Sequence, residues 1–156
     1  MKKSEKEIRR YIRLANRVIR DATTGSVNIK NVNLGEYGLS KQEYRFLVDT
    51  VNFLRKNFPN KSYSWIMRAI VRAFYVRESG ENRWIVEGLS ELGDLYSYYV
   101  VMFFDSTNRY SCSCYNTSYG YVRRRKICTH IAAVMLYRRW RGDLSYYVHK
   151  QISGSE

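Results

Sequence analysis

The feature that most constrains this chain is a cluster of cysteine and histidine residues near its C-terminal end. It reads Cys112-Ser-Cys114, then thirteen residues, then Cys128-Thr-His130, which is a C-x-C pair followed by a C-x-H pair. All three cysteines of the chain belong to it. Three thiolates and one imidazole provide the four soft or borderline ligands of a tetrahedral zinc ion. The pattern therefore predicts one structural zinc site that leaves no coordination position open for a substrate.

Other interpretations of the same four residues explain less. Buried structural cysteines beside an incidental histidine would not account for the spacing, and a Cys112–Cys114 disulfide would be strained. A catalytic cysteine–histidine pair lacks an orienting partner in the sequence. An odd number of clustered cysteines favours metal binding and a reducing compartment. His149, the other histidine of the chain, is expected at the surface near the C-terminal tail.

The spacing also predicts how the zinc ligands are presented. Alternate residues of a strand face the same way, so Cys112 and Cys114 are expected to converge at the end of a β-hairpin. Thr129 is a candidate N-cap of the last helix. Such a cap would place Cys128 beside the positive end of the helix dipole, where a thiolate is favoured, and His130 in the first turn.

Hydrophobic periodicity and capping signals predict four helices. Two N-terminal helices, about 4–22 and 41–57, each begin with a capping box, Ser4 with Glu7 and Ser40 with Glu43. A third helix begins at Ser62 or Ser64, and a last one covers about 129–141 before Gly142. The second and third helices form an αα-hairpin. A DNA-reading helix-turn-helix, with Arg68 and Arg72 on its exposed side, is the less favoured interpretation of this pair.

The region between the third and last helices is rich in aromatic and β-branched residues, which favours strands. The expected strands are 74–77, 83–89, 96–104 and 110–114, in an antiparallel meander, while 26–38 is a short strand or an ordered connector. The predicted fold is α+β: N-terminal helices, a β-meander and a ββα-type zinc finger. The predicted parts are a helical region (1–62), the finger with its preceding helix and meander (63–142), and a C-terminal tail (143–156).

The charge of the chain points to an anionic partner. Lysine and arginine outnumber aspartate and glutamate by 27 to 14, for a formal net charge of +13, which favours nucleic acid over a membrane surface. No apolar run is long enough to cross a bilayer and the first ten residues are charged, so we expect an intracellular protein of the cytoplasm or of the nucleoid or nucleus. The candidate nucleic-acid-binding residues flank the zinc ligands: Arg123, Arg124, Arg125, Lys126, Arg138, Arg139 and Arg141.

The C-x-C and C-x-H pairs, with strands before them and the apolar helix Ile131–Leu136 after them, resemble the SWIM-type zinc finger. The resemblance covers about 64–140. A ten-residue insert, Gly88 to Ser97, and the pair Tyr115-Asn116 depart from the usual pattern. SWIM fingers occur in transposase-related, chromatin-associated and ubiquitin-linked proteins and in partners of recombination mediators. The resemblance implies DNA binding or protein interaction and does not imply catalysis.

The sequence thus predicts a noncatalytic zinc protein that binds nucleic acid, with DNA favoured, through a basic face near the finger. The alternative is a protein-interaction adaptor similar to the SWIM partners of recombination mediators. An unpartnered apolar face on the first helix would favour the adaptor. An enzyme with a small-molecule substrate is not expected, because the zinc site is closed and the acidic residues form no paired-carboxylate motif.

Overall fold

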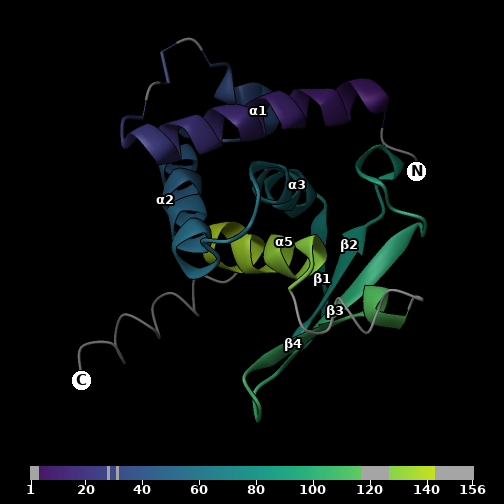
Figure 1. Ribbon diagram of the computed structural model, residues 1–156. Helices are drawn as coiled ribbons and strands as arrows, with labels where there is room; N and C mark the ends of the chain where they lie inside the picture. Colours follow the sequence, from purple (N-terminus) through teal and green to yellow (C-terminus); the bar gives the residue numbers. More distant parts are fainter. Residues whose placement is uncertain (1–3, 28, 31, 117–126, 143–156) are drawn as a thin grey trace, which may run out of the picture.

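The computed structural model describes residues 4–27, 29–30, 32–116 and 127–142, and the side chains of all of these except residues 116, 141 and 142. It confirms the α+β fold: helices come first, a sheet follows, and a helix comes last (Figure 1). The helices are α1 (Glu5–Thr24), α2 (Lys41–Asn57), α3 (Tyr63–Ala73) and α5 (Thr129–Tyr137). The strands are β1 (Val76–Gly80), β2 (Arg83–Glu87), β3 (Tyr98–Phe104) and β4 (Arg109–Cys112). Short helical turns are η1 (Leu34–Tyr37), η2 (Ser90–Leu92), η3 (Ser113–Asn116) and η4 (Arg138–Gly142).

Serine caps set the starts of the first three helices. The predicted capping box at Ser40 and Glu43 is complete, with both reciprocal hydrogen bonds formed. Ser4 caps α1 by accepting from the Glu7 amide, but the Glu7 carboxylate accepts from the Tyr75 hydroxyl (3.1 Å) instead of closing a box. Ser62, rather than Ser64, caps α3. The predicted boundaries of α1 and α2 are therefore confirmed to within two residues.

The four described strands form an antiparallel meander in the order β1-β2-β3-β4. Trp84 pairs with Val101, and Val101 pairs with Cys112, so these three side chains share the inner face of the sheet. Helix α5 contacts all four strands and lies on that same side, with α3 beyond it (Figure 1). The meander therefore places Cys112 close to the first residues of α5.

Helix α5 belongs to both of the hydrophobic clusters that the described residues form. Ala132 and Leu136 face the cluster built with α1, α2 and α3, whereas Ile131 and Val134 pack with the inner face of the sheet. All four side chains are almost fully buried. Because both clusters share this helix, a change in its position would alter the packing of the helical region and of the sheet together.

Two expectations for the N-terminal half need correction. Residues 34–37 form the 3-10 turn η1, and none of the described residues of 26–38 is in a strand, which leaves the ordered connector. The less favoured helix-turn-helix interpretation placed Arg72 on the exposed side, but Arg72 is only 2% exposed. Its guanidinium hydrogen-bonds to Thr129, Asp94 and the Leu92 carbonyl. Arg72 therefore cannot contact a DNA groove as that interpretation required.

Several predictions fall outside the described residues. They concern the basic run 123–126, His149 and the tail 143–156. Within the part of the chain that the structure describes, no helix combines the length and the apolar character needed to cross a membrane.

Candidate metal centre

Each member of the predicted ligand set comes from a different local structure. Cys112 is the last residue of β4, and Cys114 lies in the turn η3 that follows. Cys128 immediately precedes α5, and His130 lies in its first turn. The expectation that one strand presents both Cys112 and Cys114 is wrong, because the chain turns after Cys112. The Cys114 amide then donates to the Cys112 sulfur (3.5 Å).

The N-cap of α5 is Cys128 and not the predicted Thr129. The Cys128 sulfur accepts a hydrogen bond from the Ile131 amide (3.4 Å), so this thiol occupies the electropositive start of the helix. Thr129 is buried, and its Oγ1 accepts from Nε of Arg72 (3.0 Å). The threonine therefore ties the start of α5 to α3 instead of capping the helix.

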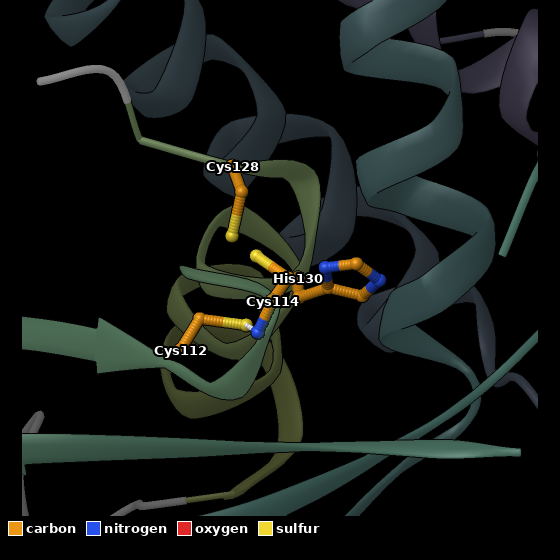
Figure 2. A group of neighbouring side chains, drawn as sticks. All are labelled: Cys112, Cys114, Cys128 and His130. Carbon is orange, nitrogen blue, oxygen red and sulfur yellow. Dashed lines mark hydrogen bonds between the residues drawn. The ribbon is translucent and has the colours of Figure 1, made fainter. Parts of the chain in front are cut away.

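The four side chains converge on one small space. One potential ligand atom from each of them lies within 4.8 Å of all the others. Figure 2 shows the three cysteine side chains gathered beside the imidazole ring of His130. Cys112, Cys114 and His130 are buried and Cys128 is partly buried. The predicted cluster is thus present, and it could hold one metal ion.

The hydrogen bonding of His130 indicates which ring nitrogen would face a metal. Nε2 lies 3.0 Å from Oδ1 of Asp94. Nδ1 is buried and has no hydrogen-bond partner among the described residues. A histidine ligand typically donates its second ring N–H to a carboxylate, which fixes the tautomer and orients the ring. A cation bound at Nδ1 would satisfy the one buried atom of this imidazole that lacks a partner.

Asp94 is a central residue of the site that sequence reasoning did not assign to it. Its carboxylate also accepts from the buried guanidinium of Arg72 and from the Leu89 amide (2.8 Å). The Tyr99 ring stacks on His130 with 3.9 Å between centroids. The sequence held only one signal for this role, an aspartate within the ten-residue insert. Its spacing from the ligands follows no metal-site pattern.

Two groups of the site, Asp94 and Cys114, favour their anionic forms. Burial raises the pKa of Asp94, but the hydrogen bond with His130 and the charge of Arg72 outweigh it, so this pKa is below its usual value. Hydrogen bonds from the thiols of Cys112 and Cys128 lower the pKa of Cys114, which makes Cys114 the preferred thiolate. The same contacts raise the pKa of Cys112.

His130 would lose a proton when a metal binds. Burial lowers its pKa, but the hydrogen bond with Asp94 and the proximity of the Cys114 and Cys128 sulfurs raise it to about 10. A metal must compete with that proton, so metal binding at this site releases protons to solvent.

The structure describes only two of the predicted nucleic-acid-binding side chains. Arg138 is 8% exposed, its guanidinium donates to the Tyr110 hydroxyl (2.8 Å), and it lies over the ring of Trp84 (4.9 Å). Arg139 is partly buried and lies over the Phe53 ring, 3.2 Å from its centroid. The others are outside the described side chains: Arg123, Arg124, Arg125, Lys126 and Arg141.

Comparisons with protein-family models, with curated proteins and with solved structures gave no match. The resemblance to SWIM fingers therefore stays a prediction from the sequence. The described chain places Cys112 and Cys114 at the end of the β3–β4 hairpin, and Cys128 and His130 at the start of α5.

Proposed function

We propose that the Cys3His cluster holds one zinc ion with a structural role. Thiolate and imidazole donors prefer zinc to magnesium or calcium, which take oxygen ligands. The unpartnered Nδ1 of His130 beside three thiols is the observation that carries the proposal. Three sulfurs and one nitrogen complete a tetrahedron, so the ion would have no open position for catalysis.

The position of the cluster supports a structural role for the ion. Cys112 ends the last strand of the sheet and Cys114 lies just after it, whereas Cys128 and His130 begin the helix that both hydrophobic clusters share. A tetrahedral ion would join these two segments with four bonds. Zinc-binding free energy at such a site contributes directly to folding.

Chelation tests the structural role. Purified protein is analysed for zinc, treated with a strong chelator, and examined by thermal melting and near-ultraviolet circular dichroism. We expect a lower Tm and a weaker near-ultraviolet signal, both restored by zinc. Unchanged Tm and spectrum after confirmed loss of zinc would exclude a structural role.

We further propose that the protein is a noncatalytic SWIM-like module that binds nucleic acid. The net charge of +13 supports this. Four cations of α1 are exposed along one side of the helix at helical spacing: Lys6, Arg9, Arg13 and Arg20. In the basic face near the finger, the run 123–126 keeps its predicted role, whereas Arg138 is buried and we assign it to packing.

The adaptor alternative lacks the feature that would have favoured it. It called for an unpartnered apolar face on α1. Instead, the apolar residues of this helix are buried in the core with α2 and α3: Ile8, Leu14, Ala15, Val18 and Ile19. The exposed side of α1 is basic, which suits phosphates better than an apolar protein surface.

A salt titration of binding tests the nucleic-acid proposal. Zinc-loaded protein is titrated with short single-stranded and duplex DNA and RNA at increasing salt. A variant with Arg123, Arg124 and Arg125 changed to Ala is compared with a charge-matched control in which the exposed α2 residues Lys41, Arg45 and Lys56 are changed to Ala.

The salt dependence gives a clear result either way. If about six phosphate contacts form, affinity falls roughly a thousandfold between 50 and 200 mM salt, and the 123–125 variant loses more than the control. No binding at about 50 mM salt would reject the proposal and return the adaptor to first place.

A further inference from the structure

The face of the sheet opposite α5 is open in the described structure. Because side chains alternate along a strand, the neighbours of the buried residues Trp84, Val101 and Cys112 project from the other side. None of the described helices covers that side (Figure 1). We call it the outer face. The residues that define it here are Arg77, Arg83, Tyr98, Met102, Phe104 and Arg109.

A row of large apolar side chains runs along β3 on the outer face. Tyr98 is 56% exposed, Phe104 is 45% exposed and Met102 lies between them at 37%. Beside this row is a hollow of about 510 Å³, lined in part by Met102 and Arg109. An exposed apolar patch with charged residues at its border is typical of a binding surface.

Arginines border this row. Arg83 pairs directly with Met102, and Arg109 pairs with Phe104. Arg77 lies on β1, and one residue of β2 separates it from β3. Within the described part of the chain, none of these three arginines has an ion pair or a hydrogen-bonded carboxylate, and all three are exposed. Among the paired residues of the described strands, Glu87, opposite Tyr98, is an acidic residue on this face.

We propose that the outer face binds single-stranded nucleic acid, with bases stacked on Tyr98 and Phe104 and phosphates held by Arg77, Arg83 and Arg109. The inference rests on the nucleic-acid binding proposed above and adds the kind of strand and a second surface. Base–aromatic stacking together with arginine contacts to the backbone is how sequence-tolerant single-strand binders work.

Charge and geometry favour this occupant. Tyr98 and Phe104 are six residues apart on one strand, which is about 20 Å. That span suits a strand of about four nucleotides, the lower end of the site sizes of small β folds. A duplex keeps its bases stacked inside and offers the two rings nothing to stack on. A second copy of this chain would bring the same three arginines toward one another.

Fluorescence anisotropy with labelled eight-nucleotide strands tests the inference. The probes are single-stranded DNA, single-stranded RNA and a duplex, each with zinc-loaded protein. We expect Tyr98→Ala and Phe104→Ala each to weaken single-strand binding roughly tenfold or more, while Tyr98→Phe, which keeps the ring, binds as the native chain does. Arg83→Gln should lower the salt slope by about one. These side chains are exposed, so Tm should stay close to that of the native protein.

The outcomes separate this inference from the proposed function. If no probe binds at about 50 mM salt, the proposed nucleic-acid function fails, and the inference fails with it. Native single-strand binding that Tyr98→Ala and Phe104→Ala leave unchanged would overturn the outer face alone. Binding to the duplex probe alone would also overturn the outer-face inference. Loss of self-association in these variants, measured by light scattering, without loss of strand binding would assign the face to a protein contact.

Discussion

His130 Nε2 lies 3.0 Å from Oδ1 of Asp94, and both side chains are almost completely buried. The contact joins the first turn of α5 to the insert between β2 and β3. Through the other oxygen of Asp94, it continues to Arg72 of α3. His130 of the Cys3His cluster is therefore oriented by a carboxylate that is itself held by a buried cation.

Asp94→Asn should weaken zinc binding by about 10- to 100-fold, the usual effect of losing a carboxylate behind a histidine ligand. The substitution keeps the size of the side chain but removes the charge that faces His130 and Arg72. Competition with a chromophoric zinc chelator measures the affinity. Glu91→Gln, an exposed residue of the same insert, is the control and should bind zinc normally. Equal affinity in the two variants would show that Asp94 does not orient the ligand.

Gly88→Ala should disturb the metal site from a distance. A Cβ added at Gly88 would lie 1.8 Å from the Tyr96 carbonyl oxygen, so the backbone of the insert that carries Asp94 must move. The Gly88 amide also donates to the Ser97 carbonyl (2.8 Å), a bond that this movement would break. We expect a lower Tm and weaker zinc binding.

Gly35→Ala is the matched control for this change. A Cβ at Gly35 would meet only Oδ1 of Asn33, at an ordinary 3.5 Å, so Tm should change little. If Gly88→Ala lowered Tm while leaving zinc affinity intact, the insert would matter for folding without positioning Asp94.

Local signals in the sequence were sufficient for the helices and for the ligand set. Ser40 and Glu43 form the complete box that their spacing predicts, and all three cysteines meet at one place with His130. The capping box depends on residues close to one another along the chain. The cluster depends on a combination of donor residues that is typical of metal binding. Long-range contacts therefore change little in the structures that these signals predict.

Sequence reasoning missed the contacts that buried arginines make with residues far away along the chain. Arg138 was predicted to bind nucleic acid, and the helix-turn-helix alternative placed Arg72 on an exposed face. Each is instead buried against partners more than twenty residues away. A cationic side chain is assigned to the surface by default, because burial is costly without compensation. Here the compensation comes from Asp94 in one case and from aromatic rings in the other. Neither pairing leaves a pattern in the sequence.

Tyr44→Phe should lower the free energy of unfolding by about 1–3 kcal/mol. The Tyr44 hydroxyl donates to Oδ2 of Asp21 at 2.5 Å, and both residues are buried between α1 and α2. Burial and the adjacent carboxylate raise the pKa of Tyr44, so the hydroxyl remains a donor across the accessible pH range. Phenylalanine would leave Asp21 buried without this donor.

Urea denaturation measures the change. Tyr63→Phe is a suitable comparison, because its hydroxyl bonds to Asn16 at an exposed position and should contribute little. Equal stability of the two variants would mean that other groups satisfy Asp21.

Arg138→Ala should lower stability by about 2–3 kcal/mol without a specific loss of nucleic-acid binding. The guanidinium lies over Trp84 and Phe103 and bonds to Tyr110, so its removal opens the contact between the end of α5 and the sheet. Denaturation and anisotropy are compared at a temperature where the variant is folded. Arg139→Ala, which loses the contact with Phe53, should be destabilised by about 1 kcal/mol. Weaker binding by folded Arg138→Ala protein, at unchanged stability, would restore Arg138 to the binding face.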